Sequence, residues 1–110
     1  MSDDALDRHN NRPTRKWTGE PDMVPQLEWW RDNDPDTGRR VVELMELAIE
    51  NRRVTIGKPK RVGGLHGVWS MRITSEHRLF YAVGRDCIRF LSCIGHDLSE
   101  DLWHELREGR

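Results

Sequence analysis

The sequence predicts a single α+β domain, and a change of pattern along its 110 residues carries that prediction. Between residues 21 and 53 the apolar side chains recur at helical spacing. From residue 68 onward the repeat shortens to two residues, the period of half-buried strands. Two helices followed by antiparallel strands are typical of a sheet with helices packed on one face.

The N-terminal part predicts an arm and then an edge strand. Residues 1–15 offer only Ala5 and Leu6 for burial, so we expect them to be disordered. Residues 16–18 predict a short edge strand around Trp17. The folded domain is therefore expected to begin at this strand.

Two helices are expected next. Pro21–Arg31 predicts the first, and Gly38–Arg53 predicts the second and longer one. Thr37 can cap the start of the second helix, and Arg52 and Arg53 suit the negative end of its dipole. Its apolar stripe, at i, i+3, i+4 and i+7, consists of Val41, Leu44, Met45 and Ala48.

Three strands are expected after the helices. Residues 68–73 and 78–83 alternate in polarity, and residues 87–94 form a third, mostly apolar strand. Thr74–His77 and Gly84–Asp86 have the length of hairpin connections. The three strands therefore predict an antiparallel meander.

Residues 98–110 predict a short amphipathic helix. A capping-box pattern runs from Asp97 to Glu100, and Gly109 can end the helix. Its apolar stripe consists of Leu98, Leu102 and Leu106. The helix either completes the core or forms a partner-binding surface, so we separate it from the central domain of residues 16–97.

Composition excludes several classes of protein. No window approaches 18 consecutive apolar residues, and the N-terminus lacks the apolar core of a secretory signal. Cys87 and Cys93 lie six apart in one predicted strand, where they cannot meet, so we expect no disulfide and a reducing cytoplasm. The Cys and His spacing does not match a zinc site, and we expect no metal and no cofactor.

Charge is unevenly distributed along the chain. Residues 16–50 hold four Lys/Arg against nine Asp/Glu, whereas residues 51–97 hold nine against three. The basic segment coincides with the predicted strands. It is either a surface for a phosphate-bearing partner or a solvated sheet face whose arginines pair with the acidic helices.

The basic side chains are concentrated in one stretch. A glycine-rich loop with Lys58, Lys60 and Arg61 directly precedes the first strand of the meander. Arg72 lies in that strand, and Arg78 begins the next one. Paired strands that hold several fixed cations are well suited to grip a phosphodiester.

The same stretch carries a longer motif. It reads G-K-P, then G-x-W-S-x-R-I-T-x-E-H-R-L-x-Y-A-V, and the third strand leads to a histidine. The matching residues are Gly57-Lys58-Pro59, Gly67, Trp69-Ser70, Arg72-Ile73-Thr74, Glu76-His77-Arg78-Leu79 and Tyr81-Ala82-Val83. In these positions the chain resembles the YoeB/Txe branch of the RelE superfamily, bacterial toxins that cut messenger RNA.

The resemblance implies a RelE-like fold and ribosome-dependent cleavage of mRNA. The ribose 2′-hydroxyl attacks the neighbouring phosphate, which requires a base, fixed cations and an acid for the leaving 5′-oxygen. By resemblance Arg78 is the main phosphate clamp and Arg72 a second one, with Lys58 and Arg61 as further phosphate contacts. His96 matches the general acid of the family.

Two positions depart from the family pattern. Lys60 stands where the family has a loop glutamate, which the resemblance implies is the general base. Asp97 stands where the family has a tyrosine after the histidine. Lys58 and Arg61 would favour a neutral Lys60, which could then act as the base, as the lysines of the RelE branch suggest. Alternatively Lys60 only binds phosphate and His96 does the proton work. Asp97 either orients His96 or caps the following helix.

The resemblance also implies partners: a cognate antitoxin, the ribosome and mRNA. It is compatible with a homodimer, and it implies no association with a membrane. Two rival functions stay open. One is a non-catalytic protein on the RelE/ParE fold, of the gyrase-binding type or a degenerate toxin. The other is an RNA-binding module without chemistry, which predicts salt-dependent binding and no cleavage.

Overall fold

The computed structural model describes residues 15–50 and 58–108. The predicted arm lies outside these ranges except for Arg15, whose backbone N–H donates to Ile49 O at 2.8 Å. The elements are β1 (Lys16–Gly19), α2 (Met23–Asn33), α3 (Pro35–Ile49), β2 (Lys60–Arg61), β3 (Val68–Arg72), β4 (Arg78–Val83), β5 (Cys87–Ser92) and α4 (Glu100–Arg107).

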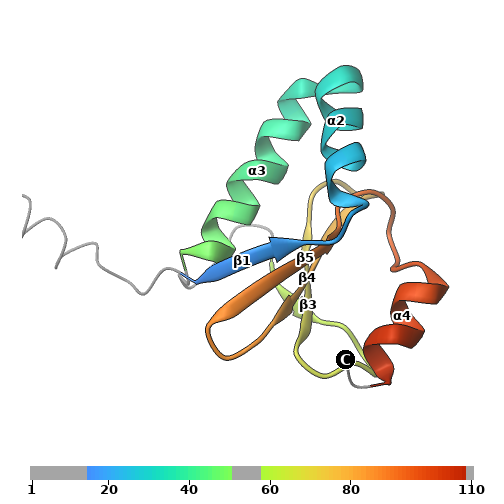
Figure 1. Ribbon diagram of the computed structural model, residues 1–110. Helices are drawn as coiled ribbons and strands as arrows, with labels where there is room; N and C mark the ends of the chain where they lie inside the picture. The colour runs from blue at the N-terminus through green and yellow to red at the C-terminus, as the bar shows by residue number, and fades with distance from the viewer. Residues whose placement is uncertain (1–14, 51–57, 109–110) are drawn as a thin grey trace, which may run out of the picture.

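The strands form one sheet in the order β1-β5-β4-β3-β2. The meander of β3, β4 and β5 is antiparallel, as predicted, and β2 extends it antiparallel to β3. The edge strand β1, also predicted, pairs in parallel with β5. The sequence did not predict this parallel pair, which becomes available because α2 and α3 carry the chain across between β1 and the rest of the sheet (Figure 1).

Helices α2 and α3 pack against each other and against β5, on one face of the sheet (Figure 1). All four residues of the predicted α3 stripe are buried there. They meet alternate strand residues in the main core, including Met71, Leu79, Ile88 and Phe90. The predicted two-helix layer on one sheet face is confirmed, and it follows from a 3.6-residue stripe meeting a two-residue alternation.

Helix α4 covers the opposite face of the sheet. Its predicted stripe Leu98, Leu102 and Leu106 packs against a second buried cluster of Val68, Phe80 and Leu91. The stripe therefore completes a second, smaller core. In Figure 1, α4 lies away from the α2–α3 layer.

The start of the second helix differs from the prediction. Helix α3 begins at Pro35 and is capped by Asp34, because the backbone N–H and the hydroxyl of Thr37 both donate to the Asp34 carboxylate, at 3.2 and 2.7 Å. Proline suits the first helical turn, where its missing N–H has no partner to lose. Thr37 thus serves the cap as a donor, and the predicted end at Arg52 and Arg53 lies outside the described residues.

The start of the last helix also differs. Ser99 caps α4 by accepting from the backbone N–H of Leu102 at 3.2 Å, so the predicted capping box from Asp97 to Glu100 is wrong. Ser99 has the extended backbone of a cap residue, directly before the first helical residue. The first helix begins at Met23, two residues later than predicted. Within the described residues, no helix is both long and apolar enough to cross a membrane.

Candidate nucleic-acid interface

The register of β2 against β3 separates the basic residues of the loop. Lys60 is paired with Ser70, and Arg61 is paired with Trp69. Directly paired side chains share a face, so Lys60 lies on the α4 side of the sheet and Arg61 on the α2–α3 side. The Arg61 guanidinium lies 5.4 Å from the centre of the Trp69 ring. The structure therefore does not bring Arg61 together with Lys60.

Three cations do share a face. Arg72 and Arg78 are paired directly across β3 and β4, and alternation places them on the side of Ser70 and Lys60. We call Lys60, Arg72 and Arg78 the cationic cluster. Within the described residues, none of the three forms an ion pair with a carboxylate. Like charges directly opposite each other are unfavourable in a sheet, so an anion between them would be stabilising.

The orientation of Arg78 is set by a buried serine. Arg78 Nε donates to Ser70 Oγ at 2.9 Å, and Ser70 is only 5% exposed. The side chain thus leans diagonally across β3, and its Nε–H is satisfied by a neutral partner. The positive charge and the outer N–H groups of the guanidinium stay available for a ligand.

The backbone around Arg72 is tied to the helix layer. Arg40 of α3 donates from Nε to Ile73 O at 3.1 Å and from Nη2 to Arg72 O at 3.3 Å. Sequence reasoning missed both Arg40 and Ser70 as supports of the site. Ser70 lies in the W-S-x-R motif, where a polar residue at a buried strand position was the available signal.

Lys58 lies just before β2 with an exposed side chain. Its φ is +48°, and it is the one non-glycine residue with positive φ among those that the structure describes. The left-handed conformation is unfavourable for a side-chain-bearing residue and occurs at sites where the surroundings impose it.

The predicted acid lies beside the start of β4. Gly95 O accepts from the backbone N–H of Arg78 at 2.9 Å, so His96 follows a residue bonded to the Arg78 backbone. The His96 side chain is 64% exposed, and its Nδ1 lies 3.8 Å from Asp97 Oδ1. Asp97 does not cap α4, and its carboxylate lies beside the His96 ring.

A different arginine on the same sheet face is neutralised. Arg89 Nε lies 2.6 Å from Glu20 Oε2, a close ionic contact without hydrogen-bond geometry. Arg89 Nη2 also lies 3.4 Å from Glu105 Oε2 of α4. The interpretation in which the arginines of the basic segment pair with acidic residues thus holds for Arg89 and fails for Arg72 and Arg78.

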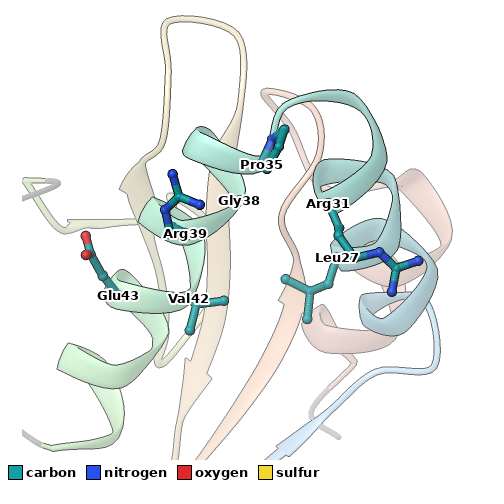
Figure 2. A pocket seen from close by; sticks show the side chains of 7 residues that line it. All are labelled: Leu27, Arg31, Pro35, Gly38, Arg39, Val42 and Glu43. Atoms are coloured by element: carbon teal, nitrogen blue, oxygen red, sulfur yellow. The ribbon is translucent and has the colours of Figure 1, made fainter.

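A pocket of about 390 Å³ lies between α2 and α3 (Figure 2). Apolar Leu27 and Val42 face it, and charged side chains surround it. Its full lining is Leu27, Arg31, Pro35, Gly38, Arg39, Val42 and Glu43. None of the predicted site residues contributes to this pocket.

The chain is similar to known proteins over most of its length. The model of the family described as "YoeB-like toxin of bacterial type II toxin-antitoxin system" matches residues 20–97. Toxin RelK of Mycobacterium tuberculosis is 36% identical over 78 residues, which cover 70% of this chain and 92% of that protein. Toxin YoeB of Escherichia coli K12 is 39% identical over 72 residues, which cover 62% and 82%.

Solved structures of YoeB-type toxins superpose on the chain. A YoeB dimer from Staphylococcus aureus superposes with a TM-score of 0.67 at 30% identity, over 76% of this chain and 99% of that one. A YoeB/ParE toxin from Agrobacterium tumefaciens gives 0.65 at 26% identity, over 74% and 99%. Helix α4 lies beyond the region that the family model matches.

Proposed function

The chain belongs to the YoeB-like toxin family of bacterial type II toxin–antitoxin systems, and from that premise we propose that it cleaves mRNA on the ribosome. In the proposed reaction the ribose 2′-hydroxyl attacks the adjacent phosphate, and the 5′-oxygen leaves. Cationic side chains supply the stabilisation of the charge that develops on the phosphate.

The observation that carries this proposal is the directly opposed pair Arg72 and Arg78. Neither has a carboxylate partner within the described residues, and Ser70 orients Arg78 without neutralising it. A phosphate placed between the two guanidinium groups would turn their mutual repulsion into two charge-assisted interactions. The opposed pair is therefore better suited to hold an anion than to stabilise the free protein.

His96 is proposed to protonate the leaving 5′-oxygen. Its imidazole is largely exposed, so a substrate oxygen can approach it, and the Asp97 carboxylate lies beside the ring. The position of the Asp97 carboxylate, 3.8 Å from Nδ1, leaves Nε2 as the nitrogen that can reach a substrate oxygen.

Lys60 is proposed to act on the 2′-hydroxyl side. It lies on the same face as Arg78, separated from it by Ser70. A neutral amine would accept the 2′ proton, whereas a charged amine would only hold the phosphate. Replacement of Lys60 by arginine separates these two roles, because guanidinium stays protonated.

We also propose a cognate antitoxin as the partner. A Staphylococcus aureus YoeB–YefM complex superposes on this chain with a TM-score of 0.63 at 29% identity. An antitoxin segment with acidic side chains would neutralise the cationic cluster and block phosphate binding. Co-purification of the toxin with the product of its neighbouring gene, and loss of cleavage in the complex, would test this partner.

The test of the activity combines purified protein, translating ribosomes and primer extension on the mRNA. The parent should produce discrete cleavage products, and Arg78→Ala should not. Arg85→Ala is the matched control, because Arg85 is exposed in the turn at the far end of β4. A parent that binds RNA in a salt-dependent way without cutting it would favour the non-catalytic alternative.

A further inference from the structure

The backbone of Gly95 is held at both of its polar groups by two consecutive residues. Its N–H donates to His77 Nδ1 at 2.9 Å, and its carbonyl oxygen accepts from the Arg78 N–H at 2.9 Å. Gly95 has a φ of +94°, which residues with a side chain rarely adopt. The two hydrogen bonds thus stabilise a sharp bend immediately before His96.

The residue two positions earlier is held by α2. Gln26 Oε1 accepts from the Cys93 N–H at 2.6 Å, and Trp30 Nε1 donates to Cys93 O at 3.0 Å. The backbone N–H and C=O groups of both Cys93 and Gly95 are therefore hydrogen-bonded. His96 is the first side chain after this anchored segment, and it is largely exposed.

The imidazole of His77 is itself held in place. Its ring packs edge-on against Trp30, with centroids 4.9 Å apart and planes at 82°, and it lies 6.4 Å from the Trp29 ring. Because Nδ1 accepts a hydrogen bond, the ring must carry its proton on Nε2 in this arrangement. The aromatic packing fixes the direction in which Nδ1 points.

We infer that His77 is a positioning residue for the cleavage reaction, an inference that rests on the proposed function. Its Nδ1 holds the Gly95 bend, and that bend directs His96 toward the phosphate bound by Arg78. One dipeptide, His77-Arg78, thereby sets both the phosphate clamp and the acid. A small displacement of a reacting group is costly, on the order of 10²-fold in rate for about 1 Å.

Two substitutions of His77 form a matched pair. In His77→Asn the amide oxygen can occupy the place of Nδ1 and accept from Gly95, whereas in His77→Gln the amide reaches the place of Nε2. Both remove the ring from Trp30, so any loss of packing is shared. We expect His77→Asn to cleave within several-fold of the parent, and His77→Gln to lose about 10²-fold in kcat with RNA affinity unchanged.

A second readout does not depend on cleavage. Hydrogen exchange at the Gly95 amide should stay slow in the parent and in His77→Asn, and become fast in His77→Gln. Equal cleavage by both variants, or a protected Gly95 amide in His77→Gln, would overturn the inference. If the parent does not cut RNA, the proposed function fails, and so does the catalytic role of His77, while the exchange pattern still decides the hydrogen bond.

The parent protein provides a test without any substitution, in case a variant does not fold. Nitrogen NMR of the His77 ring should show the tautomer with its proton on Nε2. A proton on Nδ1 near neutral pH would contradict the inference, because Nδ1 could then not accept from Gly95.

Discussion

The arginines on the sheet face that carries α4 differ in whether they are paired with carboxylates. Arg89, beneath α4, lies between two carboxylates, those of Glu20 and Glu105. Arg72 and Arg78, paired across β3 and β4 on the same face, have no carboxylate partner in the described parts of the chain. A partly buried charge is costly unless it is paired, whereas an exposed charge such as that of Arg72 can stay unpaired and meet a ligand. We propose that this difference separates arginines that stabilise the fold from those that bind the phosphate.

The largest effect is expected at Lys60, whose replacement tests whether the cationic cluster transfers a proton as well as binding phosphate. Lys60→Ala should lose about 10²–10⁴ in cleavage rate if the amine accepts the 2′ proton. Lys60→Arg should lose a similar amount, because guanidinium stays protonated. Single-turnover cleavage by ribosome complexes measures both rates. Full activity of Lys60→Arg would reduce Lys60 to a phosphate contact and leave the proton transfer to His96.

Replacing one arginine of each kind by alanine tests the comparison directly. Arg78→Ala should lower the cleavage rate by about 10²–10³ and should cost about 1 kcal/mol in the free energy of unfolding, because Ser70 Oγ loses its donor. Arg89→Ala should cost about 1–2 kcal/mol in that free energy, because two carboxylates lose their shared partner, and leave cleavage by the folded protein intact. Urea unfolding and primer extension on both variants measure the contrast. Arg78→Ala that is as toxic as the parent in cells would show that the proposed site is wrong.

The acids of α4 sharpen the comparison further. Glu100 and Asp101 are exposed in the first turn of the helix, which follows His96, whereas Glu105 is already paired with Arg89. Neutralising Glu100 and Asp101 should raise RNA affinity at low salt by roughly two- to three-fold, and Glu105→Gln should not. Filter binding across a salt series measures this difference. An equal gain from Glu105→Gln would mean that only net charge matters.

Deleting residues 99–110 is the coarser form of this test. The structure makes unfolding the expected outcome, because Leu102 and Leu106 cover the buried cluster of Val68, Phe80 and Leu91. Circular dichroism of the truncated protein measures this. A folded truncation with unchanged RNA affinity would count against any inhibitory role of α4.

The smallest effect concerns the opposite face, where titratable groups are buried instead of exposed. Burial raises the pKa of Tyr81 to about 12 and that of Cys93 to about 12. Because both folded-state pKa values exceed the ordinary ones, the stability they contribute is complete at lower pH and is lost as the pH rises from about 9 toward 12. Urea unfolding between pH 8 and pH 11 measures this loss. Tyr81→Phe should flatten part of the alkaline decline, and an unchanged slope would contradict the assignment.

Local pattern predicted much of the fold because each signal needed only neighbouring residues. The α3 stripe from Val41 to Ala48 is buried as its spacing predicts. The helix caps were less predictable, since Asp34 and Thr37 are both competent cap residues a few positions apart, as are Asp97 and Ser99. Hydrogen-bond geometry, which depends on where the preceding turn directs the chain, selects one of them.

The sequence by itself determined the helices, strands β1, β3, β4 and β5, the concentration of cations around β3 and β4, and the motif that marks the family, but Lys60 and Arg61, predicted as a loop, form strand β2. Only the tertiary structure decided which cations share one face of the sheet. Strand β2 is two residues long, and a shift of one residue in its pairing with β3 would exchange the faces of Lys60 and Arg61. Local polarity does not specify that register, because both side chains are basic and exposed. It depends on how β2 pairs with a strand whose own faces are set by two separate cores.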